Sequence, residues 1–321
     1  MGTAPDDLAG IGEFGFIAAL ARRLPQGSGV VLGPGDDAAV VAAPDSRVVV
    51  TVDVLVEGVH FRSDWAGPDD IGRRAAAASL ADIAAMGARP TALVVGLAAP
   101  PATPTAWALR LGDGLRDEAA LVGASVVGGD VTSAAQVVLS VTALGDLEGR
   151  APVTRSGARS GDIVALCGRL GWAAGGLAVL RRGFGSPRVL VEAYRRPEPP
   201  YAAGIAAAHA GATAMCDISD GLVADLGHVA QASGVVIDLD RSLLPVGEPL
   251  TDVAAAYGKN PIEWVLTGGD DHALVATFAS DAELPEGFVV IGGVRSTEGE
   301  PRVLVDGEPW SGPGGHTHFS G

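Results

Sequence analysis

The chain has 321 residues, 48% of them hydrophobic, so it can bury a sizeable core, and its length suggests two domains. A formal net charge of −16 argues against nucleic acid and against an anionic membrane surface as partners. The two cysteines, Cys167 and Cys216, exclude a disulfide framework and a cysteine-rich zinc site. We interpret both as buried core residues, and we expect a cytoplasmic protein without a signal peptide or membrane span.

The first half of the chain alternates short apolar runs with alanine-rich helical patterns. In chain order, the patterns predict a strand over 48–52 that ends at Asp53, a helix over 69–86, a strand over 91–97 and a helix over 105–121. A short strand over 125–127 then runs into Gly128-Gly129-Asp130, and another strand covers 137–144. This alternation predicts a mixed α/β fold.

The segment 149–161 contains glycine, proline and arginine and is the best candidate for a domain junction. After it we expect strands over 163–166, 235–239, 273–278 and 289–291, with helices over 202–209 and 222–232. The sequence therefore predicts an N-terminal domain over residues 1–148 and a C-terminal α/β domain over residues 149–321.

Aspartates recur at glycine-rich turns, at predicted strand ends and on one helix. Six clusters carry them: 33–37, 51–53, 80–82, 128–130, 217–220 and 268–271. Each cluster by itself has a plain alternative as a turn, because glycine tolerates positive φ and aspartate caps backbone N–H groups. Together they offer oxygen ligands of the kind that Mg²⁺ prefers. The single lysine, Lys259, lies in no phosphate-binding loop motif, so a phosphate site must use arginine, backbone N–H groups and metal ions.

Asp82 has the strongest case among these aspartates. On a helix over 69–86 it shares a stripe with Ile71 and Ala75, whereas Leu80 lies on the opposite side. A carboxylate on a core-facing stripe requires a cation or donors, and a salt bridge to arginine is the alternative to a metal. Asp53 and Asp130 have the next strongest case, because side chains at strand ends converge on ligands.

The segment from Asp217 to Asp220 opens a predicted helix. One interpretation makes Ser219 or Asp220 its N-cap; the other gives Asp217 and Asp220 to metals and places Ser219 at a phosphate near the helix N-terminus. Arg155 in the junction is either a phosphate-binding fork or a solvated loop residue.

Taken in order, these motifs are similar to those of the thiamine-monophosphate kinase family, within the aminoimidazole-ribonucleotide-synthetase-like superfamily. The resemblance covers nearly the whole chain and rests on the segments 12–14, 35–38, 51–61, 80–87, 128–130, 154–157, 217–222, 225–228 and 268–271. It implies a two-domain fold of that superfamily, a homodimer whose N-terminal domains pair their sheets, and ATP between that region and the C-terminal domain. Here Val52 stands where a hydroxyl is usual, and Asp270-Asp271-His272 replaces Glu-Asp-Tyr.

The resemblance also implies roles for individual residues. The implied magnesium ligands are Asp37, Thr51, Val52 (a contact that is either made by its backbone or missing), Asp53, Asp82, Asp130, Asp217 and Asp220. The implied ATP-binding residues are Gly129, Asp130, Arg155 and Ser219. The implied contacts to thiamine monophosphate are His60, Asp270 and Trp310, although a packed strand-end histidine is the alternative for His60.

The implied reaction transfers the γ-phosphate of ATP to thiamine monophosphate. The acceptor phosphate is largely anionic near neutral pH, so no general base is needed, and metal ions and alignment carry the catalysis. Several Mg²⁺ ions are expected, with a monovalent cation left open. The alternatives are another ATP-using member of the superfamily and a non-catalytic protein that binds metal or nucleotide.

Overall fold

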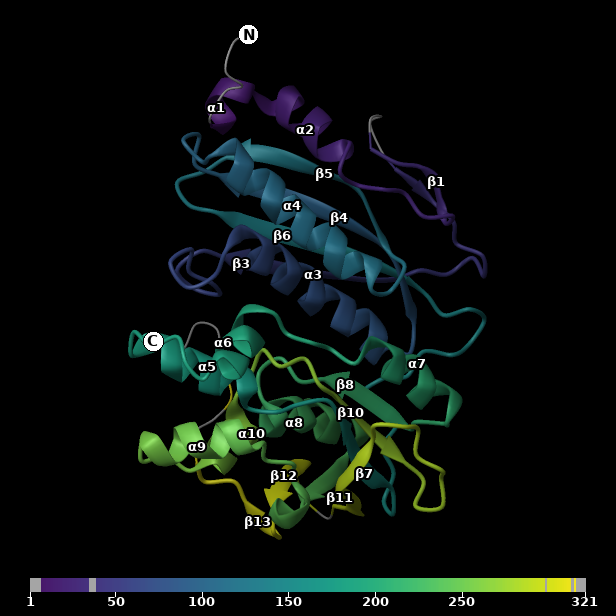
Figure 1. Ribbon diagram of the computed structural model, residues 1–321. Helices are drawn as coiled ribbons and strands as arrows, with labels where there is room; N and C mark the ends of the chain where they lie inside the picture. The colour runs from purple at the N-terminus through teal and green to yellow at the C-terminus, as the bar shows by residue number, and fades with distance from the viewer. Residues whose placement is uncertain (1–6, 35–38, 298, 313–314, 316–321) are drawn as a thin grey trace. The chain divides into compact units, whose positions relative to one another are not determined.

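The computed structural model describes residues 7–34, 39–297, 299–312 and 315, and these form two compact units (Figure 1). The first unit comprises Met1–Ile83 with Ala88–Arg150, and the second comprises Ala84–Gly87 with Ala151–Gly321. Within the described ranges, no helix combines the length and the apolar character needed to cross a membrane.

The first unit is built on a four-stranded sheet in the order β3-β6-β4-β5. Strand β4 runs parallel to β5 and antiparallel to β6, which in turn runs antiparallel to β3. The strands of this unit are β1 (Val30–Leu32), β2 (Val40–Val41), β3 (Val49–Val56), β4 (Arg89–Ala99), β5 (Ser125–Ser133) and β6 (Val138–Asp146). Its helices are α1 (Leu8–Ile11), α2 (Glu13–Ala21), α3 (Pro68–Ala85) and α4 (Thr105–Ala120).

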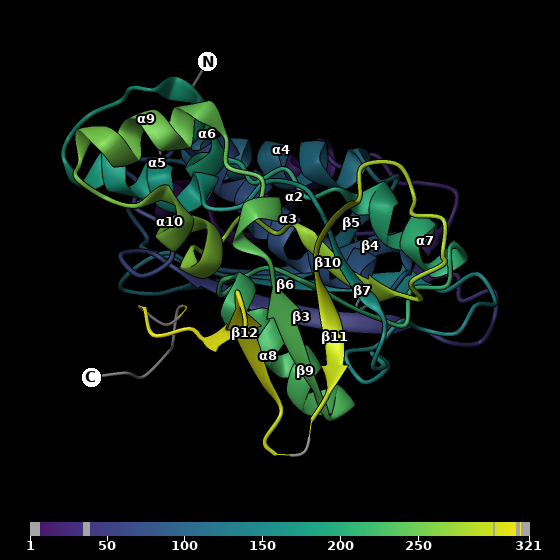
Figure 2. The same cartoon turned by 90° about the horizontal axis from the view of Figure 1, so that it is seen from below.

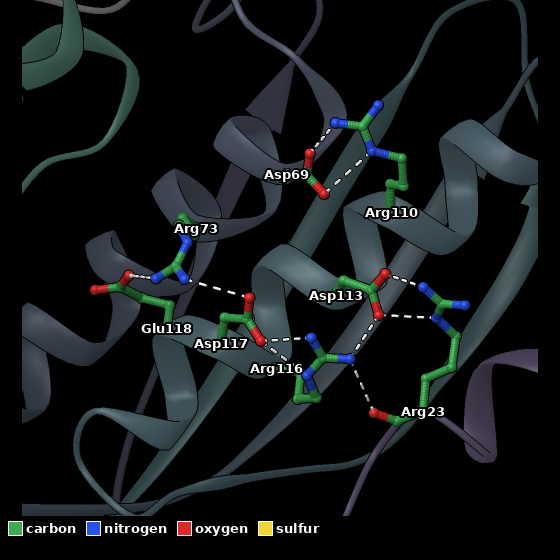
Figure 3. Close-up of polar contacts among 8 residues, drawn as sticks. All are labelled: Arg23, Asp69, Arg73, Arg110, Asp113, Arg116, Asp117 and Glu118. Atoms are coloured by element: carbon green, nitrogen blue, oxygen red, sulfur yellow. Dashed lines mark hydrogen bonds and ion pairs between the residues drawn. The ribbon is translucent and has the colours of Figure 1, made fainter.

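Helices α3 and α4 lie side by side over one face of this sheet (Figure 1). They meet at two glycines: a Cβ on Gly72 would lie 2.1 Å from the Leu111 carbonyl oxygen, and one on Gly114 would lie 2.2 Å from the Asp69 carbonyl oxygen. Ion pairs join the outer surfaces of the same helices and reach the C-terminal end of α2 (Figure 3). This close crossing fixes α3 against the sheet.

The two faces of β3 differ sharply in exposure. Val50, Val52 and Val54 are 63%, 58% and 50% exposed, whereas Leu55 on the helix-covered face is 5% exposed. Because side chains alternate along a strand, Thr51 and Asp53 share the face that α3 covers.

The second unit holds a seven-stranded sheet in the order β13-β12-β9-β11-β7-β10-β8. Strand β12 runs parallel to β9, and every other neighbouring pair is antiparallel. The strands are β7 (Ile163–Cys167), β8 (Ala214–Asp217), β9 (Val235–Leu239), β10 (Leu274–Phe278), β11 (Val289–Ser296), β12 (Arg302–Val305) and β13 (Glu308–Pro309). A buried cluster that includes Met215, Leu274 and the edge-to-face pair Phe278–Phe288 packs against this sheet.

Four helices of the second unit gather in one group, α5, α6, α9 and α10 (Figure 2). The helices of this unit are α5 (Trp172–Arg181), α6 (Arg188–Arg195), α7 (Tyr201–His209), α8 (Leu222–Ser233), the 3₁₀ turn η1 (Arg241–Leu243), α9 (Glu248–Ala256) and α10 (Pro261–Thr267). The turn after β8 carries Ser219 and Asp220, and the turn before β10 carries Asp270.

The predicted mixed α/β fold is confirmed, and the helices over 69–86 and 105–121 match α3 and α4 closely. Both cysteines are buried, as expected. The strand prediction was wrong at two aspartates: Asp53 lies inside β3 and Asp130 inside β5, because each strand continues through the polar residue. Helices α5, α6, α9 and α10 were not predicted.

Candidate active site

In the first unit, two carboxylates of the predicted set are held by hydroxyl groups across the interface between β3 and α3. Thr51 Oγ1 donates a hydrogen bond to Asp82 Oδ2 at 2.6 Å. Ser79 Oγ donates to Asp53 Oδ2 at 2.7 Å, and it also lies 3.1 Å from the Val141 carbonyl oxygen. Thr51 and Asp53 are two residues apart on a strand, and Ser79 and Asp82 are three apart on a helix. Side chains two apart on a strand share a face, and side chains three apart on a helix share a side. The four side chains therefore form two neighbouring hydrogen-bonded pairs, Thr51–Asp82 and Ser79–Asp53.

Burial along α3 differs from the prediction at one residue. Ile71 and Ala75 are fully buried as expected, but Leu80, expected on the opposite side, is also fully buried. Helix α3 is packed on both its sheet side and its α4 side, so burial alone does not single out the stripe of Asp82. What distinguishes Asp82 is its contact with Thr51.

Val52 lies on the opposite face of the sheet from Thr51 and Asp53, and its side chain is 58% exposed. Any contribution to a metal at this position therefore comes from its main chain. Asp37 lies outside the described residues.

Gly129 and Asp130 lie on the edge strand β5. A Cβ on Gly129 would lie 1.9 Å from the Val95 carbonyl oxygen, so this position accepts no side chain. A mostly apolar pocket lies beside the strand, with Asp130 in its wall. Its apolar lining comes from α2 (Phe16, Leu20), from α4 (Leu111) and from β4 (Val95, Leu97).

Asp130 is not part of the pair formed by Asp53 and Asp82. In the sheet register, Asp130 aligns with Gly96, Ser140 and then Val54. It is thus three inter-strand spacings from β3, or about 14 Å. Among the described residues, no three His, Cys, Asp or Glu side chains come close enough together to hold one metal ion.

His60 follows β3 in a turn that its own side chain stabilises. The Val56 backbone N–H donates to His60 Nδ1 at 3.0 Å, and the His60 N–H donates to the Val56 carbonyl at 2.9 Å. Because Nδ1 accepts a hydrogen bond, the neutral ring carries its proton on Nε2.

In the second unit, Asp217 is the last residue of β8 and is 4% exposed. Its Oδ2 lies 3.0 Å from Nδ1 of His272, which is itself 6% exposed. The pair joins the turn after β8 to the turn before β10. Two main-chain hydrogen bonds reinforce the joint, from the Asp270 N–H to the Ser219 carbonyl at 2.9 Å and from the His272 N–H to the Ile218 carbonyl at 3.0 Å.

Neither Ser219 nor Asp220 is the N-cap of α8, so that interpretation was wrong. The cap residue is Gly221, with φ 122° and no side-chain cap bond. Instead, Asp225 in the first turn of the helix accepts the N–H groups of Ser219, Asp220 and Gly221 through one oxygen, each at 3.0 Å. A carboxylate already occupies the helix N-terminus, so these N–H groups are not available to a phosphate.

Asp270 and His272 both have positive φ, 67° and 51°, which is uncommon for residues other than glycine. Between them, Asp271 Oδ1 accepts the Ala173 N–H at 2.9 Å and so caps α5, while its buried Oδ2 has no partner within the described part of the chain. Burial raises the pKa of the Asp271 carboxyl to about 7. Asp271 therefore ties the loop that carries Asp270 to a helix end.

Arg155 and Trp310 are the remaining predicted residues. Arg155 is exposed, and its carbonyl accepts the Ser233 hydroxyl at 2.8 Å, at the end of α8. Trp310 follows β13 and is half-buried. Gly315, five residues later, packs against the Asp220 turn, because a Cβ there would lie 2.3 Å from the Asp220 carbonyl oxygen.

The sequence interpretation missed the residues that hold the predicted ligands: Ser79, Asp225, Asp271 and His272. Ser79 had a detectable signal, since it precedes Asp82 by three residues on a predicted helix. Asp225 had one as well, as an acid in the first turn of a predicted helix.

These donor sets fit Mg²⁺. The candidates are carboxylate and hydroxyl oxygens, with no thiolate in either unit's set. Mg²⁺ usually takes one or two carboxylates and completes its shell with water and substrate phosphates. Separate pairs of carboxylates match this preference better than a site formed entirely by protein ligands would.

Comparison with known proteins matches both halves of the chain. Residues 35–147 match the family model for the N-terminal domain of AIR synthase related proteins, and residues 159–295 match the model for the C-terminal domain. The chain is 51% identical over 320 residues to thiamine-monophosphate kinase of Mycobacterium tuberculosis (strain CDC 1551 / Oshkosh), covering 99% of this chain and 95% of the relative.

Solved structures of thiamine-monophosphate kinases are also similar to this chain. Thiamine-monophosphate kinase from Stenotrophomonas maltophilia K279a is 32% identical, with a TM-score of 0.80, over 92% of this chain and 96% of the other. AaThiL complexed with AMPPCP and TMP is 34% identical, with a TM-score of 0.81, over 96% and 97%. The chain thus belongs to the thiamine-monophosphate kinase family, with both domains of the AIR synthase related proteins.

Proposed function

We propose that this chain transfers the γ-phosphate of ATP to thiamine monophosphate, giving thiamine diphosphate and ADP. Family membership supports the reaction, and a 34% identical relative has been solved with AMPPCP and TMP. The observation in this chain that carries the proposal is the pair of carboxylates, Asp53 and Asp82, each held by a hydroxyl on the neighbouring element.

The adenine base enters the apolar pocket beside β5. Its lining is mostly aliphatic, as is usual for sites that take an aromatic ligand ring. Gly129, which accepts no side chain, and Asp130 lie in the pocket wall, so the phosphates follow the edge of β5. Arg155 and Ser219 bind the phosphates in the second unit.

Mg²⁺ is held by Asp37, Thr51, Asp53, Asp82 and Asp130, with the Val52 main chain, in the first unit, and by Asp217 and Asp220 in the second. When bound, such ions neutralise phosphate charge and align the two reacting phosphates. The distance between Asp130 and β3 supports more than one ion. A monovalent cation is left open.

The residues of this chain then have to orient two anions. The acceptor phosphate oxygen attacks the γ-phosphorus, the bond to the bridging oxygen of ADP breaks, and no proton has to be removed from the anionic acceptor. His60 contacts thiamine monophosphate from a turn that its own side chain stabilises, since its Nδ1 accepts the Val56 N–H. Asp270 and Trp310 contact the same substrate.

A homodimer through the first unit belongs to the proposal. Support comes from the apolar stripe Val50, Val52 and Val54 on the uncovered face of β3, since a monomer rarely exposes such a row. The domain division 1–148 and 149–321 and the cytoplasmic location stay predictions.

The test is an assay of the purified full-length chain with ATP, Mg²⁺ and thiamine monophosphate, with the products separated by chromatography. We expect thiamine diphosphate and ADP in equal amounts, and neither when unphosphorylated thiamine replaces the monophosphate. ATP binding without thiamine diphosphate would favour a non-catalytic nucleotide-binding protein and would rule the proposal out.

A further inference from the structure

Asp225 lies in the first turn of α8 and has 2% of its surface exposed. Its Oδ2 accepts three successive backbone N–H groups, those of Ser219, Asp220 and Gly221, each at 3.0 Å. An ordinary side-chain cap binds one N–H group of its helix. Here a single oxygen fixes three peptide planes of the turn that precedes the helix.

The same turn is held on its carbonyl side as well. The carbonyls of Ile218 and Ser219 accept the N–H groups of His272 and Asp270. A Cβ on Gly269 would lie 2.2 Å from the Ser219 carbonyl oxygen, so the two turns are in main-chain contact. The turn backbone is thereby clamped between Asp225 and the 269–272 segment.

The side chains on this clamped turn are differently placed. Ser219 and Asp220 are half-exposed, and neither side chain has a hydrogen-bond partner within the described ranges of the chain. Rigid backbone with uncommitted polar side chains is the arrangement that a preorganised ligand site needs.

An acid at position 225 is expensive for a purely structural cap. The side chain is 2% exposed, so its charge loses most of its contact with water. Serine or asparagine would cap N–H groups without a buried charge. A carboxylate makes stronger hydrogen bonds than either, by roughly a factor of two, and so holds the turn more rigidly.

We propose that Asp225 is a positioning residue for the Mg²⁺–ATP site: it holds the 219–221 turn so that the Ser219 hydroxyl and the Asp220 carboxylate stay in place for the nucleotide and its metal. The inference rests on the proposed function, because it assigns a task within that site. Asp225 itself contacts the backbone of the turn and not the ligand.

Two variants of the full-length chain separate positioning from folding. Asp225→Ala removes the acceptor, whereas Asp225→Asn keeps an oxygen of the same shape without its charge. The matched control is Asp238→Asn. Asp238 is also a buried aspartate of the second unit that holds a turn, accepting the Gly307 N–H at 3.0 Å and pairing with Arg295 at 2.5 Å, but no predicted ligand lies on that turn.

The readouts are Mn²⁺ binding in the presence of ATP, followed by electron paramagnetic resonance, the Mg²⁺ concentration for half-maximal turnover, and the melting temperature. We expect Asp225→Ala to weaken Mn²⁺ binding and to raise the Mg²⁺ requirement by about 10- to 100-fold. Asp225→Asn should lose about 3- to 10-fold on both. Asp238→Asn should lower the melting temperature while Mn²⁺ binding stays at the wild-type level.

Wild-type Mn²⁺–ATP affinity in folded Asp225→Ala would overturn the inference. If that variant does not fold, Asp225→Asn decides: binding indistinguishable from that of Asp238→Asn overturns it. If the wild-type chain binds Mn²⁺ but makes no thiamine diphosphate, and Asp225→Ala weakens the Mn²⁺ binding, the inference is supported and the proposed reaction is rejected. Formation of thiamine diphosphate at the wild-type rate in every variant would support the proposed reaction and reject the inference.

Discussion

In the first unit the predicted ligands that the structure describes lie within strands and a helix, whereas in the second unit they lie at a strand end and on turns. Asp53 accepts a hydroxyl from α3 and Asp82 accepts one from β3, and these two elements are fixed by the sheet and by the glycine crossing with α4. Asp217 ends β8 and Asp220 lies in the turn after it, and this turn is held by the buried carboxylate of Asp225 and by main-chain bonds to residues 270 and 272.

The difference shows what each kind of scaffold requires. Regular elements satisfy their own backbone groups, so neutral hydrogen bonds are enough to orient a side chain on them. Turns leave N–H groups and carbonyls unsatisfied, and here buried acids and residues with positive φ complete them. We therefore expect the first unit to respond mainly to loss of single side chains and the second unit to respond also to pH.

The largest effect should come from a ligand of the first unit. Asp53→Asn keeps the shape of the side chain and an acceptor for Ser79, but removes the charge that a metal ion requires. We expect kcat to fall by about 100-fold or more, equivalent to about 3 kcal/mol of lost transition-state stabilisation. Turnover under saturating Mg²⁺ and ATP, with circular dichroism as a check on folding, measures this.

The control for that variant is Asp64→Asn. Asp64 is an exposed aspartate of the same unit, paired with Arg62 at 2.7 Å. Removing its charge should leave kcat within about twofold, since surface pairs contribute little. An unchanged rate in Asp53→Asn would show that Asp53 binds no metal during turnover.

The second prediction concerns pH and the second unit. The pKa of Asp271 is raised to about 7 in the fold, from an ordinary value of 3.8. A carboxyl whose folded pKa is raised contributes stability that is fully present below the unfolded pKa and is lost as pH rises through the folded pKa. The wild-type chain should therefore lose about 2–3 kcal/mol relative to Asp271→Asn between pH 5 and pH 8. Chemical denaturation of both proteins without added metal measures the difference.

The control in this case is Asp240→Asn. Asp240 is an exposed cap whose bonds to Ser242 lower its pKa, so its contribution is lost only in acid and should be constant between pH 5 and pH 8. A constant difference for Asp271→Asn as well would mean that Asp271 stays ionised throughout, stabilised by the N-terminus of α5.

Most of the fold was predictable because hydrophobic periodicity marks long amphipathic segments. Helices α3 and α4 were found to within two residues at each end. Strand ends were predicted less well: β3 and β5 run through Asp53 and Asp130, because a polar residue on one face does not interrupt main-chain pairing. Glycine-rich helices such as α5 were missed, since Gly175 and Gly176 lower helix propensity but are needed for close packing against Leu190.

For the candidate site, the motifs predicted the ligand residues but not the residues that hold those ligands in place. The hydroxyl of Ser79 meets Asp53 only after β3 and α3 have packed, 26 positions apart in sequence. The pairing of His272 with Asp217 likewise depends on the tertiary contact between two turns. Such tertiary contacts cannot be predicted from the local sequence. The spacing from Ser79 to Asp82 indicates only that both residues lie on one side of α3.

The smallest expected effect tests whether a neutral hydroxyl is enough to hold a ligand in the first unit. Ser79 is fully buried, so Ser79→Ala removes one oxygen and leaves Asp53 without its donor from α3. We expect the Mg²⁺ requirement to rise about tenfold, with a loss of about 1 kcal/mol in unfolding free energy. Ser125→Ala is the control: Ser125 is also a buried serine of the first unit, but its Oγ accepts the Gly27 N–H at 2.8 Å, so its loss should not change the Mg²⁺ requirement. Equal Mg²⁺ curves for the two variants would mean that the strand alone orients Asp53, and the contrast between the units would then lie entirely in the turns.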